Sequence, residues 1–193
     1  MDAIKPIETY YDGYKFRSRL EAKWAVFFNA LGIEYEYEVE GMKLGDTCYL
    51  PDFYLPYFHV YVEIKRKSIE GEEREEAIRK ISYGSSTDTF AGLICFGDPQ
   101  DNDMILYCQD MDDNGGGSSQ WKVEFAEDIL TGELVFNRVG DPTHYDRTLF
   151  PTWESKYMIP SRTEVECTVT SRIADAKLTA RRSRFEHGES PEV

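Results

Sequence analysis

Two carboxylates and a lysine in the first half of the chain have the types and the spacing needed for phosphodiester chemistry. Asp52 follows Pro51, and ten residues later the chain reads Glu63-Ile64-Lys65. Mg²⁺ is typically held in proteins by one or two carboxylates together with a substrate phosphate. A lysine beside such a pair stabilises charge on a phosphate as an ammonium or, with a lowered pKa, helps to deprotonate water. The residues therefore predict metal-assisted hydrolysis of a phosphodiester.

A β-hairpin is the element expected to bring these groups together. Two apolar runs, Cys48–Leu55 and Val60–Lys65, are separated by a four-residue loop that begins with a proline. Counting outward from the loop places Asp52 directly opposite Glu63, where cross-strand Cβ atoms lie about 4.5–5.5 Å apart. Lys65 shares the face of Glu63 because side chains alternate along a strand. Like charges at that distance repel, so a divalent cation is the natural compensation; the alternative is a solvated strand face with a Glu–Lys pair.

An amphipathic helix is predicted upstream of the hairpin, from Ser18 to a stop at Gly32. Ser18 and Glu21 have the spacing of a capping box, so Glu21 is either a capping residue or an acid that the helix turns toward the site. Three further elements are predicted around the hairpin, with a turn at 41–46 before it. They are a strand at Glu34–Glu40, a helix at Glu70–Tyr83 and a buried strand at Ala91–Phe96.

The second half of the chain has a weaker pattern and an uneven charge. Residues 97–146 contain twelve acids and two bases. Strands are predicted at Met104–Gln109, Trp121–Phe125 and Glu133–Val139, and a helix with a basic face at Ser171–Phe185. That basic face has two open interpretations, which are contact with a nucleic-acid backbone and docking onto the acidic segment.

The hairpin and the first helix resemble a known family. Pro51-Asp52 followed by Glu63-Ile64-Lys65 resembles the P-D…(D/E)-x-K signature of the restriction-endonuclease-like superfamily. The segment Phe16–Ala25 resembles the first helix of its small bacterial and phage members. The resemblance covers about residues 10–99 and implies an α/β fold. Its core has the order helix, three strands, helix, strand, and the mixed central sheet is flanked by helices.

The domain organisation follows from this resemblance. Residues 1–100 would form the nuclease-like core, and residues 101–186 would form a β-rich and helical C-terminal elaboration packed on it. Residues 187–193 are expected to be a flexible tail.

The resemblance also implies an activity and roles for particular residues. It implies a Mg²⁺- or Mn²⁺-dependent endonuclease that acts most often on DNA. By position, Asp52, Glu63 and the carbonyl of Ile64 would bind the metal, Lys65 would be the catalytic lysine, and Glu21 would be the acid contributed by the first helix. Bases near these elements are candidates for phosphate contacts, with solvated surface charge as the alternative: Arg17, Arg19, Lys23, Arg66, Lys67, and either Arg79 or Lys80.

Composition limits the remaining possibilities. The net charge of −14 excludes an overall basic coat for nucleic acid and keeps two alternatives open. These are a non-catalytic acidic binding or decoy protein, and a nuclease subunit of a larger complex; a homodimer or another protein partner is compatible with either. No apolar run reaches the roughly 18 residues of a membrane span, no apolar signal segment is visible, and the four cysteines form no C-x-x-C pair. We therefore expect a cytoplasmic protein without membrane contact.

Overall fold

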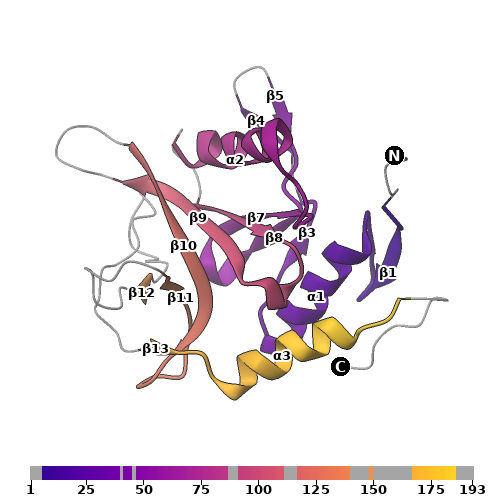
Figure 1. Ribbon diagram of the computed structural model, residues 1–193, viewed down its shortest axis with the longest axis vertical. Coiled ribbons are helices and arrows are strands. Elements are labelled where there is room, and N and C mark those ends of the chain that lie inside the picture. The colour runs from indigo at the N-terminus through magenta and orange to yellow at the C-terminus, as the bar shows by residue number, and fades with distance from the viewer. Residues whose placement is uncertain are drawn as a thin grey trace.

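A mixed nine-stranded sheet with helices on both faces forms the centre of the protein (Figure 1). The computed structural model describes residues 6–39, 41–44, 47–86, 91–110, 117–139, 148–149 and 167–185. Along the sheet the strands follow the order β12-β11-β10-β9-β8-β7-β6-β3, and β13 also pairs with β10. Their bounds are β3 Glu36–Tyr37, β6 Phe53–Leu55, β7 Val60–Lys65, β8 Ala91–Phe96, β9 Asp103–Asp110, β10 Gly117–Asp128, β11 Leu134–Arg138, β12 Thr148–Leu149 and β13 Cys167–Thr168.

Three helices cover the two faces of this sheet. α1 (Arg19–Leu31) and α3 (Ser171–Arg182) pack side by side on one face, and α2 (Gly71–Ser86) packs on β8 and β9 from the other. The side chains of β8 alternate between the two layers, because Leu93 joins the core under α1 whereas Ile94 joins the cluster under α2. Burial on both faces explains why β8 is an uninterrupted apolar run. β7 pairs with β8 in parallel and with β6 in antiparallel, so the sheet is mixed.

The first helix begins and ends where its capping residues predict. The Ser18 hydroxyl accepts a hydrogen bond from the Glu21 amide at 3.2 Å, and Gly32 ends the helix at φ 69° in the left-handed region that glycine tolerates. Trp24 and Phe27 are buried, and the Phe27 ring meets that of Phe125 from β10 at 5.4 Å. Burial of this apolar face fixes which side of α1 turns toward the sheet.

The hairpin prediction is confirmed in its register but not in its first strand. Phe53 pairs with Val62 and Leu55 with Val60, as predicted. The predicted strand Cys48–Leu55 is instead two strands, because β5 (Thr47–Tyr49) pairs with β4 (Met42–Leu44) in a separate small sheet. The predicted turn at 41–46 is wrong for that reason, although residues 45–46 lie outside the described part.

Shorter differences occur on either side of the site. The predicted strand Glu34–Glu40 is reduced to β3, and a 3₁₀ turn, η1 (Pro56–Phe58), occupies the hairpin loop. A second small hairpin, β1 (Thr9–Tyr11) with β2 (Tyr14–Phe16), precedes α1. The predicted helix Glu70–Tyr83 corresponds to α2, and the predicted strand Ala91–Phe96 coincides with β8. The main sheet and its helices therefore follow the predicted order of helix, three strands, helix and strand.

Beyond residue 100 the chain continues the same sheet and the same core. The predicted strands are confirmed as parts of β9, β10 and β11, and Phe125 and Phe136 lie in the cluster that contains the α1 aromatics. A further 3₁₀ turn, η2 (Pro99–Asp101), connects β8 to β9. Residues 187–193 lie outside the described part, as do residues 111–116 and 140–146 of the acidic segment.

The basic face of α3 turns largely toward the protein itself. Arg172 forms an ion pair with Glu127 at 2.7 Å, and Lys177 donates to Asn102 Oδ1 at 2.6 Å. Arg181 donates to Gln100 Oε1 at 2.9 Å. These three contacts support docking onto the segment 97–146.

In the described part of the chain, no helix combines the length and the apolar character needed to span a bilayer.

Close packing between α2 and β8 gives a first testable prediction. A Cβ atom added at Gly92 would lie 2.6 Å from Cγ2 of Ile81, which is fully buried. We expect Gly92→Ala to lower the free energy of unfolding by about 1–3 kcal/mol, measured by urea denaturation. In an Ile81→Ala background, Gly92→Ala should lower the free energy of unfolding by less, because the colliding methyl group is absent. Equal costs in both backgrounds would contradict this steric explanation.

Candidate active site

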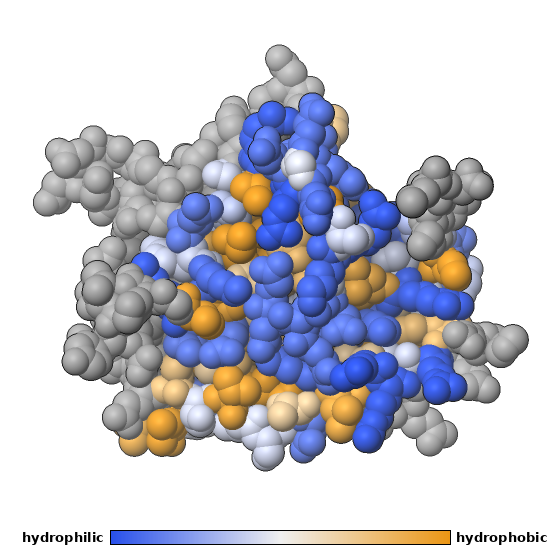
Figure 2. All heavy atoms as spheres, viewed as in Figure 1, coloured by the Kyte–Doolittle hydropathy of each residue, from blue (hydrophilic) through white to orange (hydrophobic). Residues whose placement is uncertain are grey.

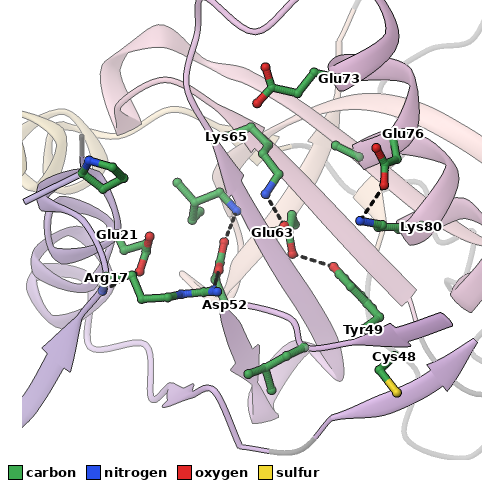
Figure 3. A pocket seen from close by; sticks show the side chains of 14 residues that line it. Arg17, Glu21, Cys48, Tyr49, Asp52, Glu63, Lys65, Glu73, Glu76 and Lys80 are labelled. Atoms are coloured by element: carbon green, nitrogen blue, oxygen red, sulfur yellow. Dashed lines mark hydrogen bonds and ion pairs between the residues drawn. The ribbon is translucent and has the colours of Figure 1, made fainter. Parts of the chain in front are cut away.

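A pocket of about 520 Å³ opens beside the hairpin, between the start of α1, the end of β5 and α2 (Figure 3). Asp52, Glu63, Lys65 and Glu21 all line it, so the structure brings the predicted catalytic residues together. Its lining contains five acidic and three basic residues. The side chains of Asp52 and Glu63 lie on the same side of the sheet, which is the arrangement that the hairpin register predicts.

Asp52 lies one residue before β6 and reaches across to the next strand. Its Oδ2 atom accepts a hydrogen bond from the backbone N–H of Ile64 at 2.6 Å, and its Oδ1 atom is paired with the guanidinium of Arg17. Only 3% of the residue is exposed. The backbone carbonyl of Asp52 accepts a hydrogen bond from the Glu38 amide at 3.0 Å, so its main chain is held beside β3 and its carboxylate is fixed by the backbone of β7.

Glu63 is held from two sides. Its Oε2 atom accepts a hydrogen bond from the Tyr49 hydroxyl at 2.7 Å, and its Oε1 atom is paired with the ammonium of Lys65. The residue is 7% exposed, and Tyr49 is similarly buried. Its orientation therefore depends on a tyrosine from the β4–β5 hairpin as well as on its own strand.

Glu21 combines the two roles that its spacing leaves open. Its Oε1 atom accepts a hydrogen bond from the Ser18 hydroxyl at 2.7 Å, so Glu21 contacts the N-cap through the Ser18 side chain and not through the Ser18 amide of a full capping box. Its Oε2 atom accepts from the Tyr37 hydroxyl at 2.6 Å and from the Arg17 amide at 3.1 Å. The carboxylate is 8% exposed and lines the pocket. Glu21 is therefore a cap that also adds negative charge to the site.

Crowding of carboxylates changes the protonation of the pocket. Burial, followed by the charges of Glu63 and Glu21, raises the pKa of Asp52 to about 8. Burial by itself would lower the pKa of Lys65, but Glu63 and Asp52 outweigh it, and that pKa is raised. In the metal-free protein this favours the ammonium form of Lys65 over the form with a lowered pKa that would help to deprotonate water. Lys65 is an ammonium, which suits the stabilisation of phosphate charge.

The donor set fits a divalent ion that keeps much of its water. Two buried carboxylates that line one pocket match the usual protein contribution to a Mg²⁺ site. Within the described ranges, no three or more His, Cys, Asp or Glu side chains are grouped closely enough to hold a metal. The structure therefore gives no support for Glu21 as a third direct ligand beside Asp52 and Glu63. The role of the Ile64 carbonyl stays a prediction.

The predicted phosphate contacts separate into two groups. Arg17 lines the pocket, where it bridges Asp52 and Glu38. Arg66 and Lys67 follow Lys65 but do not line the pocket, and they face Glu73 and Asp101 respectively.

Of the two bases that were open on the second helix, one lines the pocket, and the predicted base Arg19 of the first helix does not. Arg79 is exposed and outside the pocket, whereas its neighbour Lys80 lines it and pairs with Glu76 at 2.9 Å. Arg19 lines a second, separate pocket. In each case the helical phase, set by the buried face, decides which base reaches the site.

Two tyrosines at the site are missing from the sequence interpretation. Tyr37 and Tyr49 each donate to one of the flanking acids, Glu21 and Glu63. The alternation around Tyr37 contained a weak signal, since that residue sits on the apolar side of a predicted strand. No signal in the sequence pointed to Tyr49, because its contact with Glu63 depends on how the β4–β5 hairpin folds back.

Tyr49 provides a second testable prediction. We expect Tyr49→Phe to reduce cleavage about 10–100-fold, because Glu63 loses the group that orients it. Tyr54→Phe is the matched control, since the Tyr54 hydroxyl contacts His59 at 2.8 Å and not the site. Steady-state cleavage kinetics compare the two variants, and equal rates would show that the Tyr49 hydroxyl has no role in the reaction.

The fold and the pocket together define a mixed α/β protein with a buried acidic site beside a lysine. Comparison of the chain with protein-family models, curated proteins and solved structures found no match. The function is therefore argued from the geometry of the site.

Proposed function

We propose that this protein is a Mg²⁺- or Mn²⁺-dependent nuclease that hydrolyses phosphodiester bonds, with DNA as the substrate. The observation that carries the proposal is the convergence of Asp52, Glu63 and Lys65 in one pocket, with both carboxylates buried. The order helix, three strands, helix, strand, with β7 parallel to β8, further supports a restriction-endonuclease-like core. The choice of DNA rests on the resemblance of the hairpin and first helix to that superfamily.

The residues divide the chemistry between them. Asp52 and Glu63 would hold the ion, which when bound lowers the pKa of water and neutralises phosphate charge. The Ile64 N–H and the Tyr49 hydroxyl fix the two carboxylates so that little reorganisation is needed. The Lys65 ammonium stabilises the charge that develops on the phosphoryl oxygens.

Arg17 has a separate contribution in this proposal. Its side chain is about half exposed and pairs with Asp52 inside the pocket. With a cation held by Asp52, the Arg17 guanidinium would be able to contact a substrate phosphate, and a planar fork of donors suits that group. Arg17 therefore belongs to substrate binding.

A cleavage screen tests the proposal. Purified protein is incubated with supercoiled plasmid, single- and double-stranded DNA, and RNA, each with Mg²⁺, Mn²⁺ or EDTA. We expect cutting of at least one DNA substrate with metal, none with EDTA, and none by Lys65→Ala under any condition. Failure to cut any substrate with either metal would overturn the enzymatic proposal, and equal cutting by Lys65→Ala would indicate a contaminating nuclease.

One observation favours a second candidate, a non-catalytic acidic binding protein on the same fold. Arg17 and Lys65 already pair with Asp52 and Glu63, so the site has internal counter-charges. A calorimetric titration with Mg²⁺ and Mn²⁺ separates the candidates. Binding at millimolar or lower concentration, lost in Asp52→Asn, supports the nuclease, whereas no heat of binding supports the non-catalytic candidate.

A further inference from the structure

A second pocket, of about 340 Å³, lies between α1 and the segment that follows α3. Its lining consists of Arg19, Leu20 and Lys23 from α1, and Ser183, Arg184 and Phe185 from beyond α3. We call this the basic pocket. The two contributing segments are more than 150 residues apart in sequence and meet because α1 and α3 pack side by side (Figure 1).

The charge of the basic pocket is opposite to that of the active-site pocket. Among the described residues, three of the six that line it are cationic and none is acidic, whereas the active-site pocket has more acids than bases. The Lys23 ammonium lies 3.8 Å from the Asp98 carboxylate. In a chain with a net charge of −14, such a cluster is a local attraction for anions in a repulsive background. Figure 2 shows one face of the molecule, on which hydrophilic side chains predominate and apolar ones are scattered.

The shape of the basic pocket is fixed by packing. Leu20 and Phe185 are partly buried against the main core, and the Phe185 ring meets that of Tyr11 at 6.2 Å. Helix α3 ends at Ser183, whose amide donates to Thr179 O at 3.0 Å and whose hydroxyl donates to Ala180 O at 2.6 Å. This helix end holds Arg184 at the edge of the pocket opposite the α1 bases.

The two pockets lie on different sides of one helix. Arg19 and Glu21 are two positions apart on α1 and therefore point about 200° apart around its axis. An α-helix with side chains is about 10–12 Å across, so the pockets are separated by a distance that a few nucleotides of one strand can span. A strand that enters the active site has room to continue around the start of α1.

We propose that the basic pocket binds a backbone phosphate of the nucleic-acid substrate, away from the bond that is cut. Lys23 and Arg184 would contact the phosphate from the edge of the pocket, and Arg19 lines the pocket with them. The nature of the ligand rests on the proposed nuclease function, whereas the anion site rests on the pocket itself. Binding at this site offsets the electrostatic repulsion between the phosphate backbone and the acidic protein. The site does not take part in bond cleavage.

Nucleic-acid binding tests this inference without any cleavage. The protein carries Lys65→Ala and is kept in EDTA, and the anisotropy of a fluorescent oligonucleotide is followed between about 50 and 200 mM NaCl. The test variant is Lys23→Glu with Arg184→Glu. The control is Lys15→Glu with Arg182→Glu, which changes the net charge equally at exposed residues outside the pocket.

The expected result is specific for the pocket. The test variant should bind at least about 10-fold more weakly at low salt, and the slope of log affinity against log salt should shrink by about 2. The control variant should lose less than about 3-fold in affinity for the oligonucleotide, with the slope of log affinity against log salt unchanged. If charge reversal unfolds the test variant, as judged by circular dichroism, the Lys23→Gln and Arg184→Gln pair replaces it, with the same change of slope expected.

The outcomes distinguish this inference from the proposed function. Equal loss in test and control overturns the inference, even where the wild-type protein cleaves DNA. Pocket-dependent binding without any cleavage sustains the inference and overturns the nuclease. Absence of oligonucleotide binding at low salt, or equally tight binding of polyglutamate, overturns the assignment of the pocket to nucleic acid.

Discussion

Lys65→Met is expected to reduce the rate of metal-dependent DNA cleavage by about 10²–10³-fold, because it removes a charge that stabilises the transition state. The Lys65 ammonium is paired with Glu63 and lies in the pocket, where its raised pKa keeps it charged. Methionine preserves the apolar stem and removes only the charge. The loss should appear in kcat more than in KM, since the ammonium acts on charge that develops during the reaction.

A neighbouring lysine supplies the control for this prediction. Lys67→Met removes the same charge two residues along the chain, where the side chain faces Asp101 outside the pocket. We expect its kcat to remain within about 2–3-fold of wild type, as for a surface charge that does not touch the reacting groups. Equal losses in both variants would mean that general electrostatics, and not a catalytic lysine, explains the effect.

Asp52→Asn is expected to abolish cleavage and to remove the response of the protein to Mg²⁺. In the metal-free protein, burial and the nearby Glu63 and Glu21 disfavour the Asp52 carboxylate and raise its pKa to about 8. A bound cation relieves that crowding, so millimolar Mg²⁺ should raise the melting temperature of the wild type. Asparagine keeps an oxygen for the Ile64 amide but has no charge. The variant should therefore melt at or above the metal-free wild type and show no shift with Mg²⁺.

Differential scanning fluorimetry with and without Mg²⁺ measures this prediction, and a cleavage assay accompanies it. Asp103→Asn is the matched control, because that carboxylate lies 3.6 Å from Arg74 and does not line the pocket. It should retain both cleavage and the Mg²⁺ shift. A Mg²⁺-dependent rise of melting temperature that persists in Asp52→Asn would place the cation elsewhere and overturn the assigned ligand.

The pair of carboxylates was predictable because a hairpin converts sequence distance into spatial distance. Once Leu55 is paired with Val60, alternation determines which side chains share a face, and this register was correct. The same holds for α1, where Ser18 and Gly32 are local signals that act within one turn of the helix. Local rules of this kind need no knowledge of the rest of the chain.

The partners of those carboxylates were not predictable in the same way. Tyr49 reaches Glu63 only because the β4–β5 hairpin leaves the sheet and packs near α2. The choice of Lys80 over Arg79 depends on the rotation of α2, which is set by buried Ala77 and Ile81. These contacts come from packing between distant elements, and no local pattern records them.

Residue types and spacing by themselves therefore determined the order of the main-sheet strands and their helices in the first half and the meeting of two acids with a lysine. Short-range hydrogen bonding and side-chain alternation are sufficient for that. Only the tertiary structure decided that Arg17 pairs with Asp52, that Lys65 stays charged in the metal-free protein, and that Arg172, Lys177 and Arg181 of α3 contact the segment 97–146. Each of these depends on burial and on charges brought together from distant segments, because electrostatic energy follows distance in space and not separation along the chain.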